Sequence, residues 1–158
     1  MKIEFDVKMT TKKMYDYMMY FTYTGLSFWL AVAMGLLLLA SFVVSKHPLY
    51  LLAGIAVIVY LPIERYVQAK KQVTLNPVFK ENLHYTVTDK YMAIDVKEEH
   101  MEAEWSSIVK AVSTKNSIIL YTNKVTATIF PKEDLGDQLD AVVKVIKENV
   151  PKERMKIK

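Results

Sequence analysis

The chain has 158 residues, a formal net charge of +4 and a hydrophobic content of 52%, which is rich for one soluble domain. Residues 72–158 hold equal numbers of basic and acidic side chains, so the excess charge belongs to the preceding part. This balance argues against a nucleic-acid-binding face, which needs a clustered basic patch. The sequence contains no cysteine, which excludes disulfides and thiolate metal sites.

A first strand is predicted at the N-terminus. In "MKIEFDVKM", Ile3, Phe5, Val7 and Met9 alternate with charged residues, which is the pattern of a half-buried strand. Thr10 or Thr11 can cap a helix that follows. A single strand with one apolar face is unstable alone. We therefore expect residues 1–24 to form a strand and an interfacial helix, with the strand joining a sheet built from later residues.

A long apolar run follows. Residues 26–44 are apolar or small apart from two serines, and as a helix they extend about 28 Å, close to the hydrocarbon thickness of about 30 Å. A cleaved signal peptide does not fit, because the run begins well after Met1. We expect a transmembrane helix over about 25–45.

A second apolar run, Leu49 to Ile63, extends about 22 Å as a helix. It becomes long enough if it continues to Val67 with Arg65 reaching the headgroups. The prediction is a transmembrane hairpin over 25–67, its second helix at about 48–67. The alternative, a buried hairpin of a soluble protein, is less well supported because such helices usually carry a polar stripe.

The cations flanking the hairpin predict its orientation. Basic residues precede and follow the hairpin, whereas the turn between the helices offers only Lys46. The positive-inside rule then places both termini in the cytoplasm. Five of the flanking residues are expected to lie at the membrane interface and contact lipid phosphates: Lys12, Lys13, Arg65, Lys70 and Lys71.

Small residues mark one face of each apolar helix. Ala31 and Gly35 form a small-xxx-small step, and Ala53, Gly54 and Ala56 narrow the second helix. Such steps allow close helix packing. The contact is expected within the hairpin, or between two copies as a homo-oligomer through Ala31/Gly35.

Residues 68–158 are expected to form a cytoplasmic domain. A helical continuation should stop near Asn76-Pro77, and strands separated by turn residues should follow. The predicted strands are Leu83–Thr88, Tyr91–Lys97, Met101–Trp105, Val109–Ser113, Ile118–Tyr121 and Val125–Phe130. The turns are expected at Thr88–Lys90, Lys97–His100, Thr114–Asn116 and Asn123–Lys124.

One amphipathic helix is predicted over Asp134–Asn149, where Leu135, Leu139, Val142 and Ile146 recur at helical spacing. The tail from Lys152 to Lys158 is lysine-rich and is read as low in complexity. Short antiparallel strands followed by one helix favour a curved sheet or partial barrel closed at one end by that helix. This is an α+β plan of the pleckstrin-homology (PH)-like kind.

Catalytic chemistry is weakly supported. Trp105-Ser106-Ser107 could hold a serine nucleophile, but no nucleophile-elbow pattern surrounds either serine. His100, Glu102 and Glu104 share one strand face and invite a metal site, yet ligands on one strand diverge unless another segment closes the site. We expect neither an enzyme nor a bound cofactor or metal. Three residues are instead expected to anchor the fold: Trp105, Phe130 and Pro131.

Several segments resemble the YcxB-like bacterial membrane proteins, whose soluble part is PH-like. The likeness rests on Asn76-Pro77, "YTVTDKYMAI" from Tyr85, "EWSSIVKAV" from Glu104, "IILYT" from Ile118 and "IFPKEDL" from Ile129. It covers essentially the whole chain. The resemblance implies a multi-pass protein of the bacterial cell membrane with two transmembrane helices.

Two functions remain open. By analogy with small membrane proteins that carry similar domains, the chain is expected to protect the cell against a membrane-active peptide, as in bacteriocin self-immunity. The alternative is a membrane-anchored scaffold or regulator whose PH-like domain binds a protein or peptide partner. The expected partners are therefore the lipid bilayer and either a bacteriocin-like peptide or a membrane protein.

Overall fold

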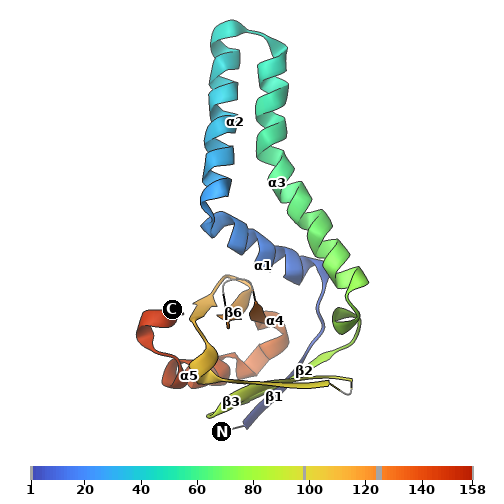
Figure 1. Ribbon diagram of the computed structural model, residues 1–158, viewed down its shortest axis with the longest axis vertical. Helices are drawn as coiled ribbons and strands as arrows, with labels where there is room; N and C mark the ends of the chain where they lie inside the picture. Colours follow the sequence, from blue (N-terminus) through green and yellow to red (C-terminus); the bar gives the residue numbers. More distant parts are fainter. Residues whose placement is uncertain (1, 98, 124–125, 158) are drawn as a thin grey trace.

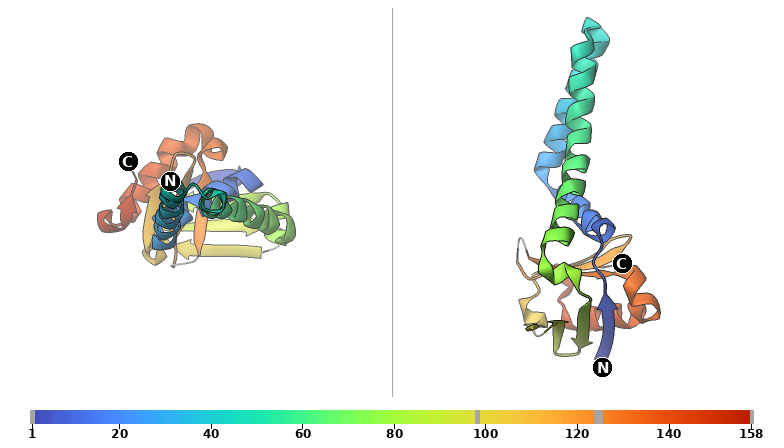
Figure 2. Two further views of the ribbon diagram at one scale, coloured as in Figure 1. Left: turned by 90° about the horizontal axis from the view of Figure 1, so that it is seen from above. Right: turned by 90° about the vertical axis from the view of Figure 1, so that its right-hand side faces the viewer.

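The chain folds as two four-stranded sheets with a long helical hairpin standing on them (Figure 1). The computed structural model describes residues 2–97, 99–123 and 126–157. Seen from above, the hairpin lies over the sheets, and the C-terminal helix lies beside them (Figure 2). The α+β class expected from the sequence is confirmed.

The first sheet combines the N-terminus with residues beyond the hairpin. Its strands are β1 (Lys2–Val7), β2 (Leu83–Thr88), β3 (Tyr91–Val96) and β4 (Glu99–Glu104), in the order β1-β2-β3-β4. All three pairings are antiparallel, and β1 meets β2 from Lys2↔Thr88 to Val7↔Leu83. The expectation that the first strand joins a later sheet is confirmed.

The second sheet contains β5 (Lys110–Ser113), β6 (Ser117–Tyr121), β7 (Ala127–Pro131) and β8 (Met155–Lys156), in the order β7-β6-β5-β8. β8 runs parallel to β5, whereas the other pairings are antiparallel. The lysine-rich tail is therefore structured: a 3-10 turn, η4 (Lys152–Arg154), leads into β8. The sequence did not predict this strand, which forms because the backbone of β5 offers a pairing edge.

Several strand boundaries differ from the prediction by one or two residues. β4 begins at Glu99, inside the predicted turn, and ends before Trp105, which opens the 3-10 turn η2 (Trp105–Ser107). Lys97 takes a left-handed conformation with φ 54°, so the chain reverses sooner than expected. The predicted start of the last strand at Val125, and Lys124 in the turn before it, lie outside the described residues.

Three helices join β1 to β2. They are α1 (Thr11–Thr24), α2 (Leu26–Ser45) and α3 (Pro48–Leu75), and η1 (Pro77–Lys80) follows them. Thr10 caps α1 by accepting a hydrogen bond from the Lys13 amide at 3.3 Å. The second apolar helix and its expected continuation form one helix that leans away from α2 in its lower half (Figure 1). Pro62 lies inside α3 and removes one backbone donor from its hydrogen-bond ladder.

α2 and α3 are long and apolar enough to cross a membrane. Only 6% of the most apolar stretch of each helix is buried. A core helix of a soluble protein would be mostly covered, so the hairpin presents its apolar side chains to its surroundings. This exposure argues against the buried soluble hairpin considered from the sequence.

Two glycines of the hairpin lie against the facing helix and leave no room for a larger side chain. A Cβ atom built on Gly35 would lie 2.5 Å from Ile58 Cγ1, and one built on Gly54 would lie 3.0 Å from the Gly35 carbonyl oxygen. The small-residue faces therefore pack within one chain. A homo-oligomer through Ala31 and Gly35 would have to displace that contact.

The predicted C-terminal helix is broken near its start. The structure has a short α4 (Lys132–Leu135), the 3-10 turn η3 (Gly136–Gln138) and then α5 (Leu139–Asn149). Gly136 has φ 48° and ψ −125°, a conformation that only glycine adopts readily. The single helix over Asp134–Asn149 was therefore wrong in its first turn and correct from Leu139 onward.

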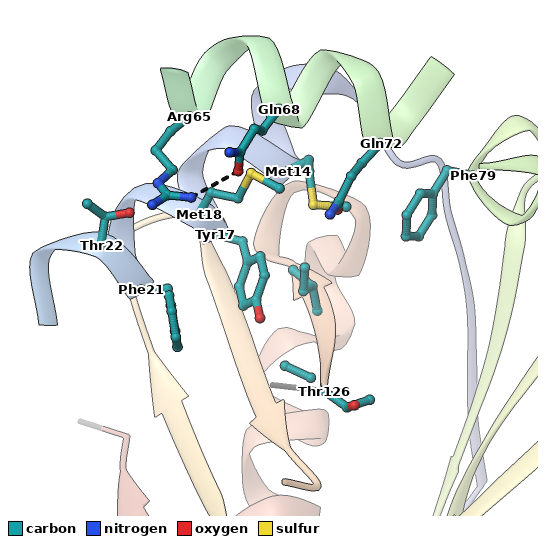
Figure 3. Close-up of a pocket in the computed structure, with 12 residues that line it drawn as sticks. Met14, Tyr17, Met18, Phe21, Thr22, Arg65, Gln68, Gln72, Phe79 and Thr126 are labelled. Carbon is teal, nitrogen blue, oxygen red and sulfur yellow. Dashed lines mark hydrogen bonds between the residues drawn. The ribbon is translucent and has the colours of Figure 1, made fainter. Parts of the chain in front are cut away.

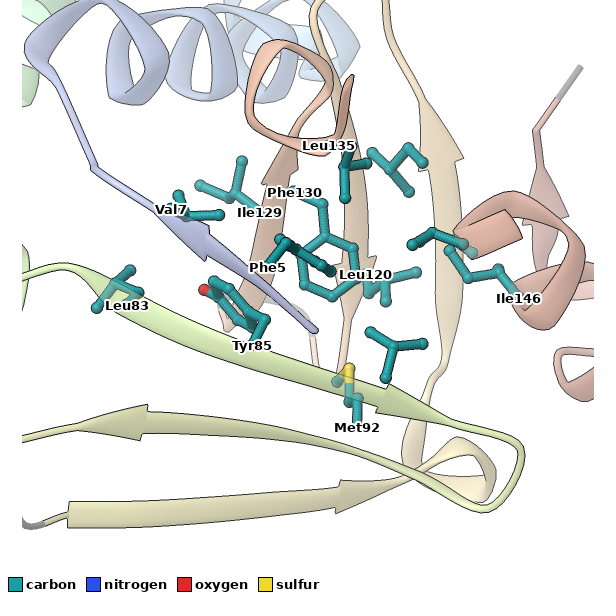
Figure 4. Packing of buried hydrophobic residues seen from close by; sticks show 14 of the residues in the cluster. Phe5, Val7, Leu83, Tyr85, Met92, Leu120, Ile129, Phe130, Leu135 and Ile146 are labelled. Carbon is teal, nitrogen blue, oxygen red and sulfur yellow. The ribbon is translucent and has the colours of Figure 1, made fainter. Parts of the chain in front are cut away.

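The core lies between the sheets and α5 (Figure 4). At its centre, Phe5 of β1, Tyr85 of β2 and Phe130 of β7 pack with ring centroids 5.0–5.5 Å apart. Val142 and Ile146 of α5 are fully buried in the same cluster. Residues from both ends of the chain therefore meet in one core.

Candidate functional site

The five residues expected at the membrane interface differ in their surroundings. Lys12, Lys70 and Lys71 are exposed, and Arg65 is half-buried. Lys13 is only 8% exposed. Its Nζ atom donates to both carboxylate oxygens of Asp134, at 2.7 and 2.9 Å, and to the Lys8 carbonyl at 2.9 Å. This corrects the lipid contact expected for Lys13, because its charge is neutralised inside the fold.

The three expected anchor residues are all buried: Trp105, Phe130 and Pro131. Trp105 Nε1 donates a hydrogen bond to the Thr88 carbonyl at 2.9 Å, which ties η2 to the end of β2. Ser106 Oγ and Ser107 Oγ both donate to Glu104, to its carboxylate and its carbonyl respectively. The serines therefore close the turn at η2 by bonding backwards to the end of β4.

The two histidines of the domain pair with carboxylates on the exposed face of the first sheet. Asp6, His84, Asp95 and His100 lie opposite one another in successive strands. His84 Nδ1 is 2.7 Å from Asp6 Oδ1, and His100 Nδ1 bonds to Asp95. Across residues 2–97, 99–123 and 126–157, no group of three or more His, Asp or Glu side chains is arranged to hold a metal ion.

A cavity of about 430 Å³ lies where the hairpin meets the sheets, and we call it the boundary cavity. One face of α1 and one face of α3 form its walls, and residues of β7 and η1 complete the lining (Figure 3). The α1 wall consists of Met14, Tyr17, Met18, Phe21 and Thr22. The α3 wall is polar and consists of Arg65, Gln68 and Gln72. The cavity therefore has one mainly apolar wall facing a polar one.

The guanidinium of Arg65 is only partly used by its neighbours. Its Nη1 donates to Gln68 Oε1 at 2.9 Å, and Gln68 Nε2 donates to Glu64 Oε1 at 2.7 Å. The Glu64 carboxylate lies 4.0 Å from Arg65 Nη2, at the limit of an ion pair. Arg65 Nε and Thr22 Oγ1 are both buried, and neither has a hydrogen-bond partner among the described residues. Both residues line the boundary cavity.

A second cavity of about 250 Å³ lies between the two sheets, and we call it the inter-sheet groove. β2, β3 and β4 form one side, and Ala127 and Thr128 of β7 form the other. Ile94 and Met101 are opposite each other on the inner face of β3 and β4, yet Met101 is 46% exposed. The second sheet thus leaves part of this apolar face uncovered, next to the edge strand β4.

Sequence reasoning singled out Arg65 but missed the cavities. Positions 14, 17, 18 and 21 share one helical face, and positions 65, 68 and 72 share another. Each pattern is visible in the sequence. Nothing local to either helix indicates that the two faces meet, because that contact depends on the tertiary fold.

The fold and its cavities define an α+β protein with an exposed apolar hairpin, an amphiphilic cavity at the hairpin base and an apolar groove between the sheets. Residues 87–146, from the end of β2 into α5, match the family model described as YcxB-like protein. The likeness expected from the sequence is confirmed for this segment, which includes neither β1 nor the hairpin. No curated protein and no solved structure matches the chain.

Proposed function

We propose that the protein is a non-enzymatic component of the bacterial cell membrane, anchored by α2 and α3. The exposed apolar surface of the hairpin supports this, since large uncovered apolar surfaces are unfavourable in water. Within the hairpin, the described residues from Leu49 to Ile63 carry no ionisable group except Tyr, so no ion pathway is proposed.

The pairing of β1 with β2 supports a simple topology. These strands precede and follow the hairpin, yet they are neighbours in one sheet. Both ends of the hairpin therefore lie on the same side of any membrane that it crosses. We assign that side to the cytoplasm because the flanking cations outnumber the single Lys46 in the turn.

The domain is proposed to be PH-like. In support, four antiparallel strands are followed by three more and then by the amphipathic α5. β1 supplies the first of these strands from before the hairpin. The membrane anchor would then be an insertion between the first and second strands of the domain.

In the proposed function, the inter-sheet groove binds part of a membrane-active peptide. This binding protects the cell from the peptide. The groove offers an apolar floor beside the edge of β4, to which an extended segment can add as a strand. Glu99, Glu102 and Glu104 on β4 are exposed. Membrane-active peptides are commonly rich in Lys and Arg, and these carboxylates complement such a charge.

Protection can be tested by expressing the protein in a sensitive bacterial strain and measuring growth inhibition by a panel of cationic membrane-active peptides. The proposal requires lower sensitivity to at least one peptide. Met101→Lys should abolish the protection by placing a cation in the groove, and Val109→Lys is a matched exposed control outside it. Unchanged sensitivity of cells with and without the protein would rule out the protective role.

The alternative function, a scaffold or regulator, uses the same groove for a segment of a protein partner. It predicts a stoichiometric crosslink from a cysteine placed at Met101 in native membranes, with no change in peptide sensitivity. The two functions therefore give opposite results in the growth assay.

A further inference from the structure

The unpartnered atoms of the boundary cavity point to a specific ligand. Thr22 is 9% exposed, and its Oγ1 and Arg65 Nε lack partners among the described residues. Burying a polar atom without a hydrogen bond is unfavourable, and more so when the group is charged. An oxygen acceptor in the cavity would remove both penalties.

We propose that the boundary cavity binds one anionic phospholipid. Its phosphate accepts hydrogen bonds from Arg65 Nε–H and Thr22 Oγ1–H, and its glycerol and upper acyl region contact Met18 and Phe21. Arg65 and Thr22 approach the cavity from α3 and α1 respectively (Figure 3). One ligand would therefore bridge the two helices.

The chemistry of the two atoms selects an anionic oxygen. The Arg Nε–H group can only donate, and a hydroxyl can donate as well. A charged donor such as a guanidinium binds an anionic phosphate oxygen more strongly than it binds a neutral oxygen acceptor. Glu64 does not fill this role, because Gln68 Nε2 engages its carboxylate at 2.7 Å and its distance to Arg65 Nη2 is 4.0 Å.

The position of the cavity favours a lipid over a soluble anion. Arg65 lies two residues after Ile63, where the apolar stretch of α3 ends, so its side chain lies at headgroup level if the hairpin spans a bilayer. Phe21 is 51% exposed at the end of α1 next to α2. A soluble phosphate would leave this apolar wall uncovered, whereas a lipid covers it.

Two exposed lysines of α3 differ from Arg65 in their position relative to the boundary cavity. Lys70 and Lys71 are on the same helix, but both are exposed and neither lines the boundary cavity. They offer only general attraction to an anionic surface. A specific site therefore predicts that Arg65 and Thr22 matter far more than Lys70 and Lys71.

The test uses the full chain, purified in detergent and analysed by native mass spectrometry after addition of phosphatidylglycerol or phosphatidylcholine. We expect one phosphatidylglycerol to be retained in preference to phosphatidylcholine. Arg65→Gln should weaken retention by about tenfold or more. Thr22→Val should also weaken it, and Thr22→Ser should restore it.

Matched controls decide between the possible outcomes. Lys71→Gln should leave retention unchanged, and an equal loss in Lys71→Gln and Arg65→Gln would overturn the proposal in favour of general surface attraction. Equal retention of both lipids would also overturn it. Displacement of phosphatidylglycerol by millimolar inorganic phosphate would identify a free-anion site instead.

The inference rests on the proposed membrane insertion, which is measured separately. Co-flotation of the chain with phosphatidylcholine vesicles after an alkaline wash reports insertion and does not require the lipid site. Flotation without selective lipid retention would reject the lipid site and leave the anchor intact. Loss of flotation would reject the anchor.

Discussion

Lys13 Nζ lies 2.7 Å from Asp134 Oδ2, although the two residues are 121 positions apart in the sequence. The contact joins α1, at the base of the hairpin, to α4, which directly follows β7. Lys13 also lies 3.2 Å from Glu133. This ion pair therefore fixes the orientation of the hairpin base on the domain.

Breaking this pair should destabilise the protein. Lys13→Met leaves Asp134, whose side chain is 18% exposed, without its cation, and we expect a loss of about 1.5–3 kcal/mol in the free energy of unfolding. Denaturation in mild detergent, followed by tryptophan fluorescence, measures the change. Lys12→Met is the exposed neighbour and should have little effect. A double variant, Lys13→Met with Asp134→Leu, should recover part of the loss.

Trp105 should contribute strongly to stability. Its indole is 4% exposed and donates to the Thr88 carbonyl. Trp105→Ala is expected to cost about 3–5 kcal/mol, because it leaves a cavity, and Trp105→Phe should lose about 1 kcal/mol for the hydrogen bond alone, in addition to any packing loss. Ser106→Ala should be nearly neutral. A denaturation midpoint for Trp105→Ala equal to that of the unaltered chain would contradict this role.

The glycine contact in the hairpin should be intolerant of larger residues. Gly54→Val would press a side chain against Leu39 Cγ, which lies 2.9 Å from the position of an added Cβ, and against the Gly35 carbonyl. The helices should separate, which is measurable as a longer distance between spin labels at Leu36 and Ile55. Ala33→Val, at an exposed position on α2, is the control and should leave the distance unchanged.

His100 should titrate above its ordinary range. Its hydrogen bond to Asp95 and the negative charge of that carboxylate raise its pKa above 6.5. A raised pKa means that protonation favours the folded state, so this contribution to stability is complete below pH 6.5 and disappears as the pH rises through the pKa of the folded protein. NMR titration of the imidazole protons measures it. Asp95→Asn should lower the pKa towards 6.5, and no change in that variant would exclude Asp95 as the cause.

The alternation of residues 3, 5, 7 and 9 was sufficient to predict β1 and its need for a partner sheet. The break at Gly136 was missed because Leu135, Leu139, Val142 and Ile146 keep a helical spacing across it. Only the glycine itself indicates the interruption. β8 was missed because two residues in a lysine-rich tail carry no periodic signal, and their pairing depends on the exposed edge of β5.

The sequence also could not distinguish between the two lysines of α1 that were predicted to lie at the membrane interface. Lys12 and Lys13 are adjacent and chemically identical, yet one is exposed and the other is 8% exposed beside Asp134. Their identical charge in the sequence gives no sign of this difference in exposure. Their difference arises from which side of α1 faces the domain, and that depends on contacts with residues more than a hundred positions away.

The insertion of the hairpin between β1 and β2 has a consequence for biosynthesis. β1 leaves the ribosome first, but its pairing partner β2 is made only after both apolar helices have emerged. The aromatic packing of Phe5 with Tyr85 and Phe130 can therefore form only after those two residues have been synthesised. Completion of the first sheet is thus delayed until β2 has been synthesised, so β1 lacks its pairing partner throughout the synthesis of α1, α2 and α3.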